Sequence, residues 1–193
     1  MLFRSVRTIA ELITAAKNNP GKITSASAGM GSSSHLTTEM LNVAAKIKLL
    51  HVPFKGAGAA ILDVLGGHTD LSFVVPGSVM AQIQAGTLIP LALTGKKPFA
   101  LLPTVPTFAA IGLPAVDPES FRFIAAPGGL PANVNQRLTS ALRTAMSAAD
   151  FKSRLIDNGF DPEFQTDKEA RAFVVRERHK WRQAVKDSGA KAN

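Results

Sequence analysis

Ser25-Ala-Ser-Ala-Gly-Met-Gly-Ser-Ser-Ser-His-Leu36 joins a β-prone run to the start of an amphipathic segment. Residues 22–25 favour a strand, and the apolar residues from Leu36 onward recur at helical spacing. Glycines and serines lie between the two, so we expect a strand, a tight turn and a helix N-terminus. The first amides of a helix lack internal partners, and glycines let an anion approach the backbone. The stretch therefore predicts a site for a carboxylate or a phosphate.

A plain connecting loop is the alternative interpretation, because most junctions of this kind only link two elements. The stretch also differs from both familiar nucleotide-binding loops. Gly29 and Gly31 are not followed by the third glycine of a dinucleotide fingerprint, and no Gly-Lys-Ser/Thr comes after them. The predicted ligand is therefore a small anion and not a nucleotide.

Composition excludes several classes of function. The chain has no cysteine, so disulfides, zinc–thiolate sites and a cysteine nucleophile are excluded. The four histidines lack metal-ligand spacing, and we expect neither a metal nor another cofactor. Residues 1–117 hold nine Lys/Arg against five Asp/Glu, and residues 118–193 hold thirteen against nine. This spread charge, with one Trp and no Tyr, argues against a nucleic-acid partner.

The N-terminus shows no targeting segment. No apolar run reaches the roughly 18 residues of a membrane-spanning helix, and residues 1–5 are too short for a signal peptide. Leu-Phe-Arg-Ser at positions 2–5 matches one reading frame of a common sequencing adapter. We hypothesise that residues 1–5 are an artefact and that Val6 continues a longer natural chain.

The rest of the sequence alternates between strand and helix patterns. Strands are expected over 22–25, 48–52, 69–75, 88–94 and 121–125, and helices over 6–18, 59–65, 76–85, 132–148, 150–158 and 167–187. A further helix is expected after the serines 32–34, carrying Leu36, Met40, Leu41 and Ala44, and a short helix within 104–111. This alternation predicts an α/β fold with a mainly parallel sheet. The proline-rich segment 95–118 is the best candidate for a domain boundary.

Two glycine-rich loops, 28–33 and 53–58, follow neighbouring strands of the predicted sheet. Parallel sheets bind ligands at the carboxyl ends of their strands, so we expect the loops to converge on one site. Lys55 adds a positive charge and the serines add hydroxyls. His35 is read as a structural hydrogen-bonding group rather than a catalyst, and Lys55 is equally well a solvated turn residue. The candidate ligand-binding residues are Ser27, Gly29, Gly31, Ser32, Ser33, His35, Lys55 and Gly56.

An esterase that uses a loop serine is the main alternative from another class. Ser25, Ser27, His35, His51 and Asp70 contain the residue types of a catalytic triad. No Gly-x-Ser-x-Gly motif is present, however, and Asp70 at a strand start is typical of a turn or cap residue. We therefore assign no catalytic residue and expect no enzymatic activity. The basic run 176–182 is interpreted as the solvated face of a helix.

Several segments together resemble one family. They are Asn19-Pro-Gly-Lys-Ile23, Ala26-Ser-Ala-Gly-Met-Gly-Ser-Ser-Ser-His-Leu36, His51-Val-Pro-Phe-Lys-Gly-Ala-Gly-Ala-Ala60, Leu102-Pro-Thr-Val-Pro-Thr-Phe108 and Ala125-Ala-Pro-Gly-Gly-Leu-Pro131. In this order they resemble the substrate-binding receptors of tripartite tricarboxylate transporters, often called Bug-type receptors. The likeness runs from about residue 6 to the end of the chain.

The resemblance implies a periplasmic-binding-protein-like fold of type II, in which two α/β lobes close on a solute. Residues 6–117 would form the complete second lobe, with a mainly parallel sheet flanked by helices. Residues 118–193 would be the C-terminal strand and helices of an incomplete first lobe, so the chain would be truncated at its N-terminus. The loops 28–33 and 53–58 would line the cleft from the second lobe.

The implied function is an extracytoplasmic, periplasmic solute-binding protein that captures a small carboxylate, with the membrane subunits of the transporter as partners. The full-length protein would be a monomer without catalysis. A ligand-sensing module is a further alternative. Three departures from the family pattern, Ala28, Phe54 and the segment 73–76, remove polar groups and indicate a smaller or more apolar carboxylate.

Overall fold

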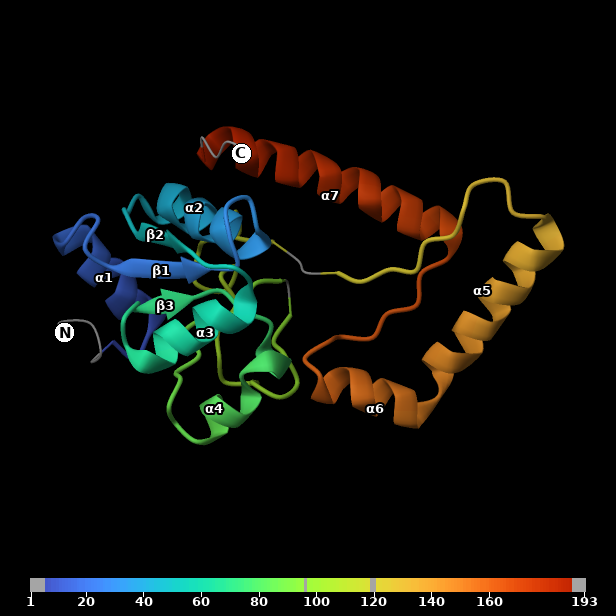
Figure 1. The fold of residues 1–193 in the computed structure, drawn as a ribbon, viewed down its shortest axis with the longest axis horizontal. Coiled ribbons are helices and arrows are strands. Elements are labelled where there is room, and N and C mark those ends of the chain that lie inside the picture. The colour runs from blue at the N-terminus through green and yellow to red at the C-terminus, as the bar shows by residue number, and fades with distance from the viewer. Residues whose placement is uncertain (1–5, 96, 119–120, 189–193) are drawn as a thin grey trace.

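The computed structural model describes residues 6–95, 97–118 and 121–188 (Figure 1). The hypothesis about residues 1–5 lies outside these ranges. The elements are α1 (Ile9–Asn18), β1 (Thr24–Ser27), α2 (Ser33–Ala45), β2 (Leu50–Pro53), α3 (Ala57–Gly66), β3 (Leu71–Ser72), the 3₁₀ turn η1 (Pro76–Ser78), α4 (Met80–Gln84), α5 (Ala132–Ser147), α6 (Ala149–Asp157) and α7 (Asp167–Ser188). None of the described helices is long and apolar enough to cross a bilayer.

The three strands form one parallel sheet in the order β2-β1-β3. Thr24 is opposite Leu50 across β1 and β2, and Ser25 is opposite Leu71 across β1 and β3. Helices α2 and α3 connect β1 to β2 and β2 to β3, as parallel connections require. The predicted parallel α/β arrangement is confirmed. The first strand begins two residues later than expected, and the third is only two residues long.

A single apolar core holds α1 and α2 against the sheet. Leu41 of α2 and Ile23 before β1 are completely buried. Phe108 and Val116, from the proline-rich segment, are buried in the same cluster. That segment therefore covers the core of residues 6–117 and is not a free linker. The full cluster is Ile9, Leu12, Ala16, Ile23, Leu41, Ala45, Leu49, Phe108 and Val116.

Two of the elements predicted between residues 88 and 111 are not formed. Residues 88–94 form no strand, and only Leu93 forms a single bridge, to Thr107. The Leu93 amide donates to the Pro106 carbonyl and the Phe108 amide donates to the Leu93 carbonyl, both at 2.9 Å. Pro90 lacks an amide hydrogen, which weakens a ladder at this point. Residues 104–111 form successive turns and not a helix. The segment thus reaches the core with little regular structure.

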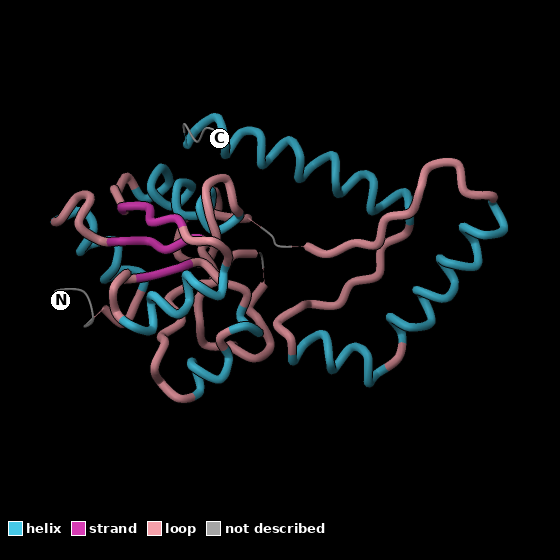
Figure 2. The backbone as a smooth tube through the Cα atoms, in the orientation of Figure 1, coloured by secondary structure: helices cyan, strands magenta, loops and turns pink. Residues whose placement is uncertain are grey.

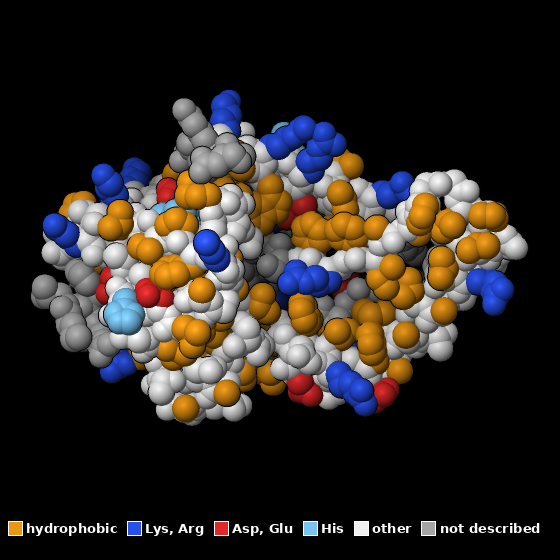
Figure 3. Space-filling model, in the orientation of Figure 1, with side chains coloured by type: hydrophobic (Ala, Val, Ile, Leu, Met, Phe, Trp, Pro, Cys, Tyr) orange, Lys and Arg blue, Asp and Glu red, His pale blue; other side chains and the backbone are white. Residues whose placement is uncertain are grey.

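The predicted strand at 121–125 is also wrong, because no described strand lies beside it. The backbone there is irregular (Figure 2), and Phe123 and Ile124 are 63% and 76% exposed. The helices α5 and α6 formed as predicted, yet neither contains a buried residue. Both stand apart from the sheet in Figure 1, and apolar side chains are visible over this part in Figure 3. An unpaired apolar strand sequence cannot form a ladder by itself.

The last helix, α7, returns to lie against α2. Lys180 ties it to the end of the region 6–117: its ammonium group donates to the Asp117 carbonyl at 2.7 Å and lies 3.0 Å from a Glu177 carboxylate oxygen. Glu177 is buried. The proposed division into 6–117 and 118–193 is therefore crossed by one anchored helix.

Candidate functional site

The two glycine loops lie side by side at the carboxyl ends of β1 and β2. The Phe54 amide donates to the Ser27 carbonyl at 3.0 Å, and the Gly56 amide donates to the Ala28 carbonyl at 3.2 Å. Hydrogen bonds thus continue past the strands and link the loops. The structure brings together the two segments that the sequence places at one site.

The backbone of the first loop requires its two glycines. Gly29 has φ +132° and Gly31 has φ +71°, values that side chains with a Cβ disfavour. A Cβ at position 29 would also lie 3.3 Å from the Phe54 carbonyl oxygen of the second loop. Ser32 caps α2 by accepting the His35 amide at 3.3 Å. The strand, turn and capped helix predicted for this stretch are all present.

A chain of serine hydroxyls closes the turn. The Ala28 amide donates to the Ser34 hydroxyl at 3.0 Å, and the Ser34 and Ser32 hydroxyls are 3.1 Å apart. Ser32 donates in turn to the Gly29 carbonyl at 2.6 Å. One direction of donation satisfies all three bonds, from the amide through both hydroxyls to the carbonyl. The serines therefore hold the loop's shape from inside.

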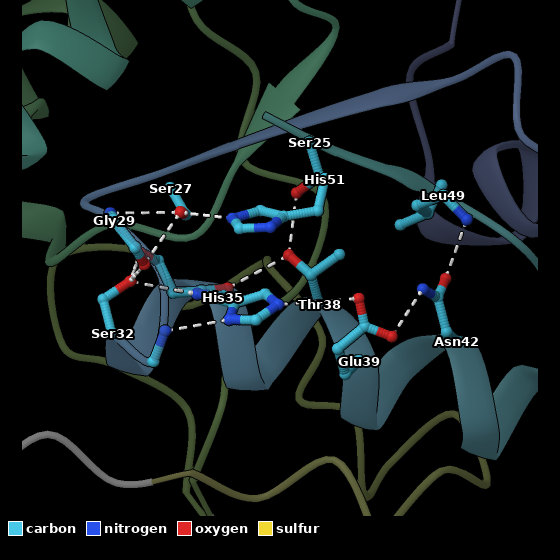
Figure 4. A network of polar contacts seen from close by, with 12 residues as sticks. Ser25, Ser27, Gly29, Ser32, His35, Thr38, Glu39, Asn42, Leu49 and His51 are labelled. Atoms are coloured by element: carbon cyan, nitrogen blue, oxygen red, sulfur yellow. Dashed lines mark hydrogen bonds and ion pairs between the residues drawn. The ribbon is translucent and has the colours of Figure 1, made fainter. Parts of the chain in front are cut away.

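His35 anchors the loop through the Gly31 amide (Figure 4). The Gly31 amide donates to His35 Nδ1 at 3.0 Å, so this nitrogen is the acceptor and the ring proton is assigned to Nε2. Nε2 lies 3.9 Å from a carboxylate oxygen of Glu39. The side chain is buried, only 5% exposed, and does not face solvent. His35 is thus a hydrogen-bonding group of the helix's first turn.

His51, on β2, stacks on His35 and holds the other glycine through Ser27. The two imidazole centroids are 3.8 Å apart with 13° between the ring planes. His51 Nε2 is 2.6 Å from the Ser27 hydroxyl, which accepts the Gly29 amide at 3.1 Å. Burial, with a smaller contribution from His35, lowers the pKa of His51 from 6.5 to about 4. His51 is therefore neutral at pH 7.

The predicted site residues divide by their access to solvent. Ser27 and His35 are buried; Gly29, Ser32 and Gly56 are partly buried; Gly31, Ser33 and Lys55 are exposed. The amides of Gly29, Gly31, Ser32 and Gly56 are used inside the protein. Among the described residues, the amides of Met30, Ser33 and Ser34 beside the first loop and of Lys55, Ala57 and Gly58 in the second have no hydrogen-bond partner, and Lys55 forms no ion pair. These are the groups of the loops that remain free for a ligand.

The residues of the possible triad do not assemble. Ser25 hydrogen-bonds Thr38 at 2.8 Å, and Asp70 accepts from the amide and hydroxyl of Thr24, at the opposite end of β1 from Ser27. Ser27 and His51 are in contact, but no described carboxylate is hydrogen-bonded to His51, and the Ser27 side chain is fully buried. A substrate has no access to this hydroxyl.

No metal centre is formed by the described residues, since they contain no group of three His, Asp or Glu side chains with suitable geometry. Two surface hollows lie elsewhere. One of about 250 Å³ is lined by residues including Glu169 and Arg176, and one of about 430 Å³ is lined by residues of α5 including Arg137. All three side chains are exposed, and neither hollow includes a residue of the glycine loops. The loops present an open wall to solvent through the exposed residues Gly31, Ser33 and Lys55.

Comparison with known proteins places the whole chain in one family. Residues 4–190 match the family described as "Tripartite tricarboxylate transporter family receptor". A Pseudomonas sp. (strain P51) protein, named for the tcbD-tcbE intergenic region, is 37% identical over 75% of this chain and 43% of its own length. BugT of Bordetella pertussis is 28% identical over 93% of this chain and 55% of its own length.

Two solved structures have the same fold. An R. palustris protein with adipate superposes with a TM-score of 0.87, at 24% identity over 97% of this chain and 62% of that one. MatC from Rhodopseudomonas palustris with bound malate gives a TM-score of 0.74, at 23% identity over 93% of this chain and 62% of that one. The chain spans about half the length of the curated relatives it matches. The chain belongs to the tripartite tricarboxylate transporter receptor family and has the α/β fold of periplasmic solute-binding proteins.

Proposed function

We propose that this protein is a non-catalytic, extracytoplasmic receptor that captures a small carboxylate for a tripartite transporter. One observation carries the proposal. In a chain of this family, the ends of the adjacent strands β1 and β2 both lead into loops before a helix, and these loops carry free amides. Lys55 lies in the second loop and has no ion-pair partner among the described residues. The adipate and malate bound in the two solved relatives support a carboxylate of similar size.

The proposed contacts use the groups that the fold leaves free. One carboxylate oxygen accepts from the Met30 and Ser33 amides beside the positive end of α2, as helix N-termini favour. The Lys55 ammonium group supplies a second, longer-range attraction from the neighbouring loop. Because the described loops form one open wall, we expect weak binding, with a dissociation constant of about 1 mM.

The absence of catalysis is part of the proposal. The Ser27–His51 contact is the one feature that favours an esterase, and burial of the serine argues against it. Because no carboxylate of the described residues is hydrogen-bonded to His51, the ring lacks the orienting group that a triad supplies. We therefore expect no hydrolysis of simple esters above the rate of the buffer. We also propose a periplasmic location, a monomeric state and delivery of the solute to the transporter's membrane subunits.

A titration with adipate, followed by ¹H–¹⁵N NMR, tests the proposed site. Lys55→Met should weaken adipate binding about threefold or more, the order of a solvent-exposed charge-assisted contact. Lys48→Met is the matched control, because it removes the same charge just before β2, away from the loops. Equal affinities in the two variants would remove Lys55 from the site, and no saturable binding by the unchanged protein would refute the proposal.

A further inference from the structure

The amides of the two glycines in the first loop share one kind of anchor, a histidine side chain. The Gly31 amide donates to His35 Nδ1, and the Gly29 amide donates to the Ser27 hydroxyl, which in turn contacts His51 Nε2. The two imidazoles come from different elements, α2 and β2, and stack face to face at 3.8 Å (Figure 4). A pair of rings thus holds both glycines of the turn, one directly and one through a hydroxyl.

We propose that His35 and His51 are positioning residues for solute binding, which fix the turn so that the Met30 and Ser33 amides face solvent. This inference rests on the proposed carboxylate site. Neither ring touches the solute in this arrangement, because His35 is buried and Ser27 separates His51 from the loop backbone. Their effect on affinity passes through the conformation of the turn.

The contacts define which form of each ring is required. Gly31 offers a donor, so His35 must present an unprotonated Nδ1. The Ser27 hydroxyl accepts a hydrogen bond from the Gly29 amide and still has its own proton to donate. Its nearest acceptor is His51 Nε2 at 2.6 Å, so this nitrogen must be unprotonated. The lowered pKa of His51 is consistent with this neutral form. Two neutral rings can also stack without charge repulsion.

The direction in which each amide of the turn points links the two rings to ligand binding. Gly29 and Gly31 turn their amides inward, and the free amides on exposed residues are those of Met30 between them and Ser33 after them. If the Gly31 bond breaks, the turn is free to rotate about a residue whose φ is +71°, and the outward set of amides is no longer fixed. Ordering the turn at the moment of binding then costs affinity.

Conservative substitutions separate positioning from bulk packing. Asn places its amide oxygen near the position of histidine Nδ1, whereas Gln places its oxygen near Nε2. His35→Asn should therefore keep the Gly31 bond and His35→Gln should lose it. For His51 the order reverses: His51→Gln should retain the Ser27 contact and His51→Asn should not. Each pair compares two polar side chains of similar size at one position.

Two readouts test the inference on the 193-residue chain. The first needs no solute: hydrogen exchange of the Gly29 and Gly31 amides, together with the imidazole ¹⁵N shifts, which report whether His35 Nδ1 carries a proton. We expect an unprotonated Nδ1 at pH 7, slow Gly31 exchange in His35→Asn and fast exchange in His35→Gln. The second is adipate affinity, which should fall about tenfold in His35→Gln and His51→Asn, the equivalent of one lost hydrogen bond, and remain near that of the parent in the other two variants.

The outcomes distinguish this inference from the proposed function. A protonated His35 Nδ1, or equal Gly31 exchange in both His35 variants, overturns the positioning role even if adipate binds. If the exchange pattern is as expected and all four variants bind adipate equally, the rings shape the turn without positioning the site, and the inference is wrong. Failure of adipate to bind the parent protein refutes the proposed function, and the solute-free measurements still decide the role of the rings in the turn. The imidazole shifts of the parent protein need no variant to fold.

Discussion

Replacing Gly29 by alanine tests the idea that the two glycine loops are built as one unit. The residue has φ +132°, and a Cβ there would lie 3.3 Å from the Phe54 carbonyl oxygen of the second loop. Gly29→Ala therefore introduces both backbone strain and a close contact between the loops. Gly31→Ala is the matched control, since its φ is +71° and nothing lies within 4 Å of its Cβ.

The magnitudes follow from these two environments. A side chain in a sparsely populated backbone region costs about 1–3 kcal/mol, and the contact at position 29 adds a shift of a few tenths of an ångström. Alanine at position 31 occupies the left-handed region in open space, at a cost of about 1 kcal/mol. Both substitutions lower the entropy of the unfolded chain by a similar amount, which cancels in the comparison. We expect Gly29→Ala to be the less stable variant by about 1 kcal/mol or more.

Urea unfolding followed by circular dichroism measures this difference, provided that the slopes of the transitions agree between variants. The Gly29→Ala midpoint should lie below the Gly31→Ala midpoint, with the Gly29→Ala variant also losing adipate affinity. If Gly29→Ala is as stable as Gly31→Ala, the two loops are not packed as described and the argument for a joined wall is refuted.

Three further outcomes are expected. Leu41→Ala should lower the unfolding free energy by about 2–5 kcal/mol in urea, because the side chain is fully buried, while Val43→Ala on the exposed side of the same helix should stay within about 0.5 kcal/mol. The pKa of His51 is about 4 in the folded protein and 6.5 in the unfolded chain, so the unfolded chain binds the proton at the higher pH. The free energy of unfolding should therefore fall as the pH drops from 6.5 towards 4. Urea midpoints should fall less over this range in the His51→Gln variant, which has no titrating group at this position. Brief chymotrypsin treatment should cut at Phe123, which is exposed in an irregular segment, before it cuts within residues 6–117. Mass spectrometry of the products identifies the first cut, and first cuts within 6–117 would contradict the described packing.

The sequence was most informative where local rules and tertiary structure agree. Glycines at 29 and 31, a serine cap at 32 and helical spacing after Leu36 specify a turn and a capped helix with little help from the rest of the fold. The alternation of strands and helices also specified the parallel sheet. Residues 88–94 and 121–125 were mispredicted because apolar runs of this length form strands only when a neighbouring strand supplies the ladder.

The sequence predicts which segments form the site, but not which of their amides point toward a ligand. The sequence placed both loops together, but it could not show that the Gly31 amide turns inward to His35 while the Ser33 amide remains free. His51 was considered only as part of a possible triad. Its signal was its register: His51 lies opposite Ser25 in the parallel sheet, and Ser25 and Ser27 share one face of β1, so the imidazole can reach the Ser27 hydroxyl. That inference needs the pairing of β1 with β2, which a single sequence does not give.

The most direct test of the account is an NMR titration of the 193-residue chain with adipate and, separately, with its neutral diamide. Adipate should shift the Met30 and Ser33 amides and those of residues 57–59 along one saturable curve, with a dissociation constant of about 1 mM, while the amides of α5 and α6 stay unchanged. The diamide should cause no saturable shift, because it lacks the negative charge that the helix ends and Lys55 favour. Equal responses to both compounds, or saturable shifts confined to residues outside the two loops, would contradict a carboxylate site at the ends of β1 and β2.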